Sequence, residues 1–142
     1  MKTDHVAKAS VTIHAEVSKV WDALTNPALI KQYLFGTETS SDWKKGSPIT
    51  YKGVWEGKAY EDKGVILDSV PNTRIVSTYW SSMSGKPDTP DQYNTVSYEL
   101  SSANGQTTLS VTQDNNPTRE SADHSASNWA SVLQSIKALL EK

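Results

Sequence analysis

The spacing of apolar residues predicts one strand and two short helices at the start of the chain. Residues 8–15 alternate between apolar and polar side chains, which is typical of a half-buried strand. Residues 17–26 place apolar side chains at i, i+3, i+4 and i+7, the spacing of one helical stripe. The pair Asn26-Pro27 predicts a break and a second helix over 27–33, because Asn is a favoured N-cap and Pro a favoured first residue.

The middle of the chain changes to a strand-and-turn pattern. Alternating or β-branched segments predict strands over residues 47–56, 59–70, 74–80, 93–102 and 106–114. Asn104-Gly105 lies between the last two segments and predicts a tight hairpin, since this dipeptide suits the turn that twisted strands need. Residues 81–92 are rich in Ser, Pro and Gly, and they predict a long connecting loop.

The end of the chain predicts one long amphipathic helix. The pair Asn116-Pro117 repeats the cap-and-proline pattern, but the serine-rich run after it disfavours helix, so the helix is expected from about Ala126 onward. One face of this helix carries Trp129, Val132, Leu133, Ile136 and Leu140.

This order of elements predicts an α+β fold, β-α-α-β6-α. Strands joined by short turns form an antiparallel meander, and the apolar face of such a sheet has to be covered. The C-terminal helix alone is long enough to do this, so we expect a curved antiparallel sheet wrapped around it. The two short helices would then support one end of the long helix. A length of 142 residues suits a single domain over 1–142.

Composition narrows the class of function. A net charge of −2 argues against nucleic acid as a partner, and no apolar run reaches the roughly 20 residues that span a membrane. The absence of cysteine excludes disulfides, a thiolate nucleophile and thiolate metal sites. The first ten residues lack the apolar run of a signal peptide, so a soluble cytoplasmic protein is expected.

Several segments in this order resemble one known family. The quoted stretches are VWDALTNP with its YLFG exit, DWKKGSPITY, GVILDSVPNTRIVSTYW and the Trp-led WASVLQSIKALLE, which together cover most of the chain. They resemble the activator-of-heat-shock-protein-90-ATPase-like family within the START-like, or SRPBCC, superfamily of birch-pollen-allergen-like proteins. The resemblance implies the helix-grip fold, with a hydrophobic cavity between the long helix and the sheet.

The resemblance also implies three functions. The first is non-catalytic binding of a lipid, polyketide-like, steroid or aromatic molecule in the cavity. The second is a co-chaperone-like interaction module that activates a heat-shock chaperone ATPase in a stress response. The third is a cyclase- or dehydratase-type enzyme, which would need an acid or base that faces inward.

Residue chemistry argues against catalysis and metal binding. The three histidines do not occur at metal-ligand spacing, and no nucleophile elbow or phosphate-binding loop is present. A catalytic pair would need two carboxylates on the inner face, and the alternation does not place two there, so solvated strand faces explain them more simply. The carboxylates on or between the strands are Glu56, Glu61, Asp62, Asp68 and Glu99. We therefore expect no catalytic residue, no metal and no cofactor.

The aromatic residues are the best candidates for a binding site. The chain has 5 Trp and 6 Tyr but 1 Phe, and a bias toward rings with polar tips suits a cavity that meets a partly polar molecule. The phase of residues 74–80 leaves open which face turns inward, and the same rings could simply fill a core. The candidate ligand-binding residues are Tyr33, Phe35, Tyr51, Trp55, Tyr79, Val96, Tyr98, Trp129 and Leu133.

Overall fold

A computed structural model describes residues 5–34, 36–55, 57–81 and 87–141, with the backbone alone at Trp55. The strands are β1 (His5–Ile13), β2 (Glu38–Ser41), β3 (Pro48–Trp55), β4 (Lys58–Val70), β5 (Arg74–Ser81), β6 (Asn94–Ala103) and β7 (Gln106–Asn116). The helices are α1 (Val17–Thr25), α2 (Pro27–Tyr33) and α3 (Arg119–Leu140), with a 3-10 turn, η1, at Pro90–Gln92. The predicted order β-α-α-β6-α is therefore confirmed, although the segments named from the sequence mark five of the six later strands and β2 has no counterpart among them.

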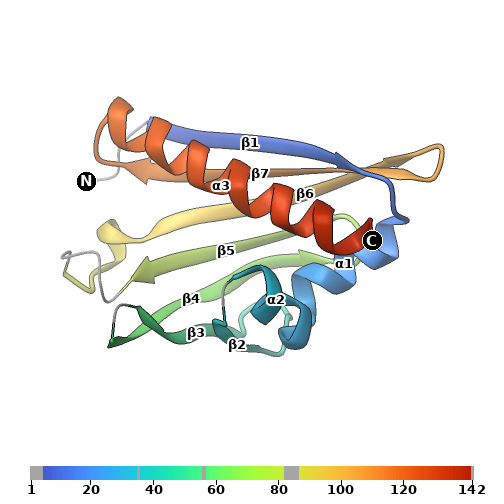
Figure 1. Ribbon diagram of the computed structural model, residues 1–142. Helices are drawn as coiled ribbons and strands as arrows, with labels where there is room; N and C mark the ends of the chain where they lie inside the picture. Colours follow the sequence, from blue (N-terminus) through green and yellow to red (C-terminus); the bar gives the residue numbers. More distant parts are fainter. Residues whose placement is uncertain (1–4, 35, 56, 82–86, 142) are drawn as a thin grey trace.

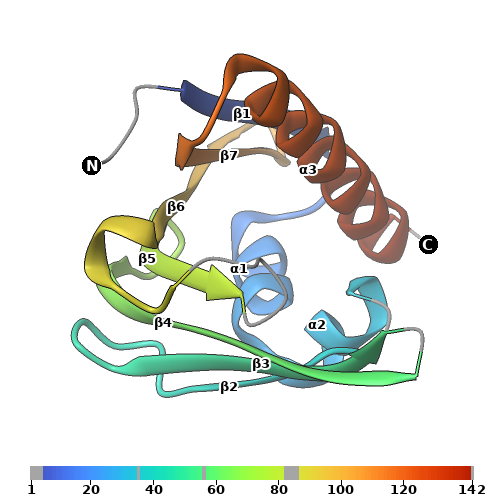
Figure 2. The same ribbon diagram turned by 90° about the vertical axis from the view of Figure 1, so that its left-hand side faces the viewer.

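The described strands form a seven-stranded sheet in the order β1-β7-β6-β5-β4-β3-β2, and all neighbouring strands are antiparallel. Strands β2 to β7 follow one another as a meander, and β1 joins β7 at the far edge. Seen end-on, the sheet is curved and α3 lies on its concave side (Figure 2). The predicted helix-grip architecture is therefore observed. Helix α3 covers the apolar face of the sheet, which would otherwise be exposed to water.

The filled part of the core lies at the C-terminal half of α3. There Leu133 and Ile136 are fully buried against side chains of β1, α1 and the inner face of the sheet, which include Ile13, Val20, Leu24, Ile75 and Leu109. Helices α1 and α2 lie at this end of the molecule (Figure 1). The two short helices thus complete the core where the long helix ends.

Two turns form where the local sequence predicts them. Asn26 ends α1 and caps α2, and its side-chain oxygen accepts a hydrogen bond of 3.0 Å from the backbone of Ala28. Asn104 and Gly105 both have positive φ, at 54° and 77°, and connect β6 to β7. Both central residues of this turn type need positive φ, which explains the Asn-Gly pair.

Helix α3 begins earlier than the sequence predicts. It starts at Arg119 rather than near Ala126, and Asn116 is not its cap but the last residue of β7. The cap is Thr118, whose side chain accepts a 3.0 Å hydrogen bond from the backbone of Ser121. Tertiary contacts outweigh the poor helix propensity of the serine-rich run, since Ala122 is fully buried within it.

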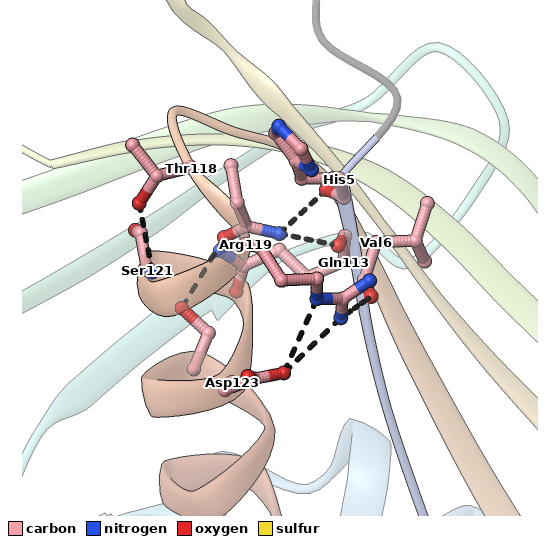
Figure 3. Close-up of polar contacts among 9 residues, drawn as sticks. His5, Val6, Gln113, Thr118, Arg119, Ser121 and Asp123 are labelled. Carbon is pink, nitrogen blue, oxygen red and sulfur yellow. Dashed lines mark hydrogen bonds and ion pairs between the residues drawn. The ribbon is translucent and has the colours of Figure 1, made fainter.

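The start of α3 is also tied to the edge strand β1. The guanidinium of Arg119 donates to the Val6 carbonyl at 3.3 Å and pairs with Asp123 one turn further along at 3.2 Å (Figure 3). Exposed pairs of this kind contribute little stability each. Their role is geometric, because they hold the start of α3 against the edge strand β1.

Candidate functional site

A cavity of about 440 Å³ lies between the N-terminal half of α3 and the inner face of the sheet. It occupies the opposite end of the grip from the filled core. Its walls come from α3, from β3 to β7 and from the segment after α2. The described lining residues are Leu34, Thr37, Tyr51, Val54, Tyr60, Asp62, Ser77, Tyr79, Ser81, Val96, Tyr98, Gln113, Ser125, Asn128, Trp129 and Val132.

The structure brings five of the nine candidate ligand-binding residues to this cavity: Tyr51, Tyr79, Val96, Tyr98 and Trp129. The face of β5 that the sequence left open is decided by burial. Ile75 and Ser77 are buried, so Tyr79, two residues further along, also faces inward. The cavity therefore collects one aromatic ring or more from each of β3, β5, β6 and α3.

The other four candidates do not join this lining among the described atoms. Tyr33 is buried beside the cavity, and its hydroxyl donates a 2.9 Å hydrogen bond to the Ala23 carbonyl, so it ties α2 to α1. Leu133 has no exposed surface and belongs to the filled core. Phe35 and the side chain of Trp55 lie outside the described residues.

Two ring pairs shape the aromatic walls. Tyr51 and Tyr79 meet edge to face with their centroids 6.0 Å apart, and Tyr98 and Trp129 meet in the same way at 5.8 Å. Edge-to-face contacts of this kind are favourable because the positive ring edge meets the negative face. The pairs join β3 to β5 and β6 to α3, and they hold the rings in defined orientations around the cavity.

Trp129 is held in place by a chain of amide side chains. Its indole nitrogen donates to Oε1 of Gln113 at 2.8 Å, and Nε2 of Gln113 donates to Oδ1 of Asn116 at 3.1 Å. Asn116 is buried, and its Nδ2 donates to the carbonyls of His5 and Gln113 at 3.0 and 2.9 Å. Figure 3 shows His5 and Gln113 beside the first turn of α3. The chain connects the edge strand to the cavity roof.

Asp62 corrects the expectation that the strand carboxylates face solvent. It is 9% exposed, lines the cavity, and its Oδ2 accepts a 2.6 Å hydrogen bond from the Tyr79 hydroxyl. Its phase could have revealed this, because Asp62 lies two residues before Gly64 and four before Ile66 on the buried face of β4. The prediction failed because a charged residue was assumed to mark the outer face.

Burial and Asp62 together change the acidity of the neighbouring phenols. Burial raises the pKa of Tyr79 far above its ordinary value, and the hydrogen bond to Asp62 adds to the shift. Burial likewise raises the pKa of Tyr51, with a second contribution from the negative charge of Asp62. Burial also raises the pKa of Tyr98. All three rings are neutral hydrogen-bonding groups at physiological pH.

Tyr60 forms the wall at the other side of the cavity and depends on a glycine. Gly53 is its cross-strand partner, and a Cβ on Gly53 would lie 2.5 Å from the Tyr60 hydroxyl. The ring therefore lies across the bare backbone of β3. Its hydroxyl reaches the hydroxyl of Thr37 at 2.6 Å, just after α2. This contact connects the start of β4 to the exit of the short helices.

The described residues include no cluster of three or more His, Asp or Glu side chains able to hold a metal ion. Within the same residues, the helices lack the combination of length and apolar character that crossing a bilayer requires. The cavity instead combines aromatic rings, hydroxyl and amide groups and one buried carboxylate. Such a lining suits an apolar or aromatic body with a few polar groups.

A family model and several solved structures are similar to this chain. The family model for Activator of Hsp90 ATPase homolog 1-like protein matches residues 14–141. The search of curated proteins found no match. Among solved structures, a protein from Cytophaga hutchinsonii is similar with 42% identity and a TM-score of 0.87, over 99% of this chain and 97% of that one.

Two more distant structures share the fold. The Aha1 dimer from Colwellia psychrerythraea has 23% identity and a TM-score of 0.73, over 96% of each chain. DynU16, a protein in the dynemicin biosynthetic locus, has 18% identity and a TM-score of 0.80, over 99% of this chain and 48% of that one. At these identities the similarity establishes architecture alone.

Proposed function

Because the chain belongs to the activator of Hsp90 ATPase homolog 1-like family, we propose that it binds an apolar or aromatic small molecule between α3 and the sheet without converting it. The observation that carries the proposal is the cavity of about 440 Å³ with its aromatic lining. Its volume falls within the range of small-molecule sites. A domain that needed the space only for packing would fill it, as the other end of this core does.

The placement of polar groups also supports binding. The hydroxyls of Tyr51 and Tyr98 have no hydrogen-bond partner among the described residues, although both rings line the cavity. Tyr hydroxyls in an apolar site usually find a partner. A bound molecule with a few polar atoms would supply it. DynU16, which shares the fold, belongs to a biosynthetic locus, and this also fits a link between the fold and small molecules.

The proposal is tested with a neutral apolar fluorescent probe such as N-phenylnaphthylamine. We expect saturable binding to the wild-type protein. Val132 lines the cavity on α3, so Val132→Phe should place a ring in the space and weaken binding by about tenfold or more, equivalent to about 1.4 kcal/mol. The matched control is Ala130→Phe on the exposed face of the same helix, which should bind like wild type.

Two results would contradict the proposal: no saturable binding to the wild-type protein, or equal binding by Val132→Phe. Native mass spectrometry of freshly purified protein adds an independent measurement. A small molecule that co-purifies with the wild type and is lost from Val132→Phe would identify the ligand class directly.

A cyclase- or dehydratase-type activity is the second candidate, and one observation favours it. Asp62 is the inward-facing carboxylate that such chemistry needs, since a carboxylate in an apolar site can take a proton from a bound carbon acid. The test is consumption of a polyketide-like substrate by wild type and by Asp62→Asn. Turnover by the wild-type protein that is lost in Asp62→Asn would show that the protein is an enzyme and that Asp62 is needed for its reaction.

A co-chaperone role is the third candidate, and the family itself motivates it. The outer face of β4 exposes Val65 and Leu67, at 41% and 43%, which gives a protein partner an apolar contact. The test is the ATPase rate of a heat-shock chaperone with and without this protein. Stimulation that Leu67→Lys removes and Val132→Phe leaves intact would assign the function to the outer face and not to the cavity.

A further inference from the structure

Asp62 is the charged residue of the described cavity lining. The described lining residues contain this one carboxylate and no lysine, arginine or histidine. The neighbouring Lys63 does not supply a counter-charge, because it points to the other face of β4. There it forms an ion pair with Asp88 at 2.6 Å. The cavity therefore presents a carboxylate without a described counter-charge.

The register of the sheet surrounds this carboxylate with aromatic and hydroxyl groups. Tyr51 on β3 and Ser81 on β5 are the direct cross-strand partners of Asp62. Tyr79, which donates to Oδ2, comes from the same strand as Ser81 and contacts the ring of Tyr51. Cross-strand partners on one face lie close together, so the three side chains form one cluster with the carboxylate.

Asp62 uses one of its two carboxylate oxygens within the described part of the chain. Its Oδ2 accepts from Tyr79, but Oδ1 is buried and has no hydrogen-bond partner among the described residues. An ionised carboxylate accepts at both oxygens, and an unsatisfied charged group inside a protein is costly. A donor group on a molecule in the cavity would remove this cost.

On the premise of the proposed function, we propose that the cavity selects an apolar or aromatic molecule that carries a protonated amine, and that Asp62 is the group that recognises it. The amine N–H donates to the carboxylate, and the rings of Tyr51 and Tyr79 line the cavity beside it. A positive charge is attracted to the face of an aromatic ring, which adds to the recognition. The apolar part of the molecule lies along Val96, Val132 and Trp129. Fatty acids are disfavoured, since their carboxylate would meet that of Asp62 without a compensating cation.

The experiment compares three ligands with the same eight-carbon chain at neutral pH by isothermal titration calorimetry: octylamine, octanol and octanoate. We expect octylamine to bind most tightly and octanoate most weakly. In Asp62→Asn the affinity for octylamine should fall by about tenfold or more, because the charged hydrogen bond to the carboxylate is lost. The affinity of the same variant for octanol should stay within about twofold of wild type, since no ion pair is lost.

Glu61→Gln is the matched control. It removes one carboxylate from the adjacent, exposed position of β4, where Glu61 faces Lys52 on the outer surface at 3.9 Å. This variant should retain the wild-type preference for octylamine. Far-ultraviolet circular dichroism of each variant shows that it is folded, and the ligand series on wild-type protein needs no variant at all.

The outcomes separate the two proposals. Equal binding of the three ligands, tighter binding of octanoate, or an unchanged octylamine affinity in Asp62→Asn would overturn the amine preference and leave small-molecule binding intact. Failure of all three ligands and of the neutral probe to bind wild-type protein would overturn both.

Discussion

The hydroxyl of Tyr79 lies 2.6 Å from Oδ2 of Asp62, inside a cavity whose other described lining residues are apolar, aromatic or uncharged polar. The two side chains come from adjacent strands, and both belong to the inner face of the sheet. A hydrogen bond to a charged group in such surroundings is stronger than one at the surface. The hydrogen bond between Tyr79 and Asp62 therefore contributes to the stability of the fold and sets the position of the carboxylate in the cavity.

Removing the Tyr79 hydroxyl should lower the stability of the fold. Tyr79→Phe leaves Asp62 without its described donor, and we expect the free energy of unfolding to fall by about 1.5–3 kcal/mol, measured by urea denaturation. Tyr93→Phe is the matched control, because the Tyr93 hydroxyl donates to Asp88 at the exposed outer surface. The free energy of unfolding should fall clearly less in Tyr93→Phe than in Tyr79→Phe. Equal losses in the two variants would contradict a special role for the buried pair.

Alkaline pH should weaken the fold through the buried phenols. Burial raises the folded-state pKa of Tyr33, Tyr51, Tyr79 and Tyr98, so the folded protein holds these protons more tightly than the unfolded chain. Their contribution is complete below the unfolded pKa of about 10 and is lost as the pH rises above it. Urea denaturation across this range should show stability that falls above about pH 10.

Ultraviolet titration of tyrosinate provides the matching observation. In the folded protein part of the tyrosine signal should stay un-ionised above about pH 10, whereas in concentrated urea all of it should titrate together. A folded protein whose six tyrosines titrate together with the urea sample would rule out the proposed environment.

Two glycines should respond differently to the same substitution. In Gly64→Ala the new Cβ would lie 1.7 Å from the backbone oxygen of Thr78, so β4 and β5 would have to separate. In Gly53→Ala it would meet the Tyr60 hydroxyl at 2.5 Å, and a side chain can rotate away. We expect Gly53→Ala to cost about 1–3 kcal/mol, as overpacking usually does, and Gly64→Ala to cost more. Thermal denaturation of both variants provides the comparison, and the reverse order would contradict it.

The amide chain behind Trp129 predicts a further effect on the cavity. Asn116→Ala removes the hydrogen bonds to His5 and Gln113, and we expect a loss of about 1–3 kcal/mol in urea denaturation. Probe binding should also weaken, because Gln113 then holds the indole less firmly. Gln134→Ala is the control, an exposed amide of α3 outside the described cavity lining, and should change stability and probe binding little. Unaltered probe binding by folded Asn116→Ala would show that the amide chain does not position the roof.

Local sequence signals were enough to predict most of the fold. Asn26-Pro27 and Asn104-Gly105 act through the conformations of single residues, so their turns are independent of distant contacts. The start of α3 was misplaced for the opposite reason. Burial of Ala122 and the Thr118 cap outweigh a serine-rich run whose propensity alone disfavours helix.

The candidate site was only partly predictable. Periodicity placed Tyr51 and Tyr98 on the faces that line the cavity, since side chains alternate along a strand. It could not decide the inner face of β5. It does place Asp62 in phase with Gly64 and Ile66, but accepting a carboxylate in the interior requires knowledge of its partner on another strand. The pairing of Asp62 with Tyr79 is a property of sheet register and curvature, and these follow from contacts between residues far apart in the chain. The sequence by itself therefore determined the elements and their order, while the tertiary structure decided that a carboxylate faces the cavity.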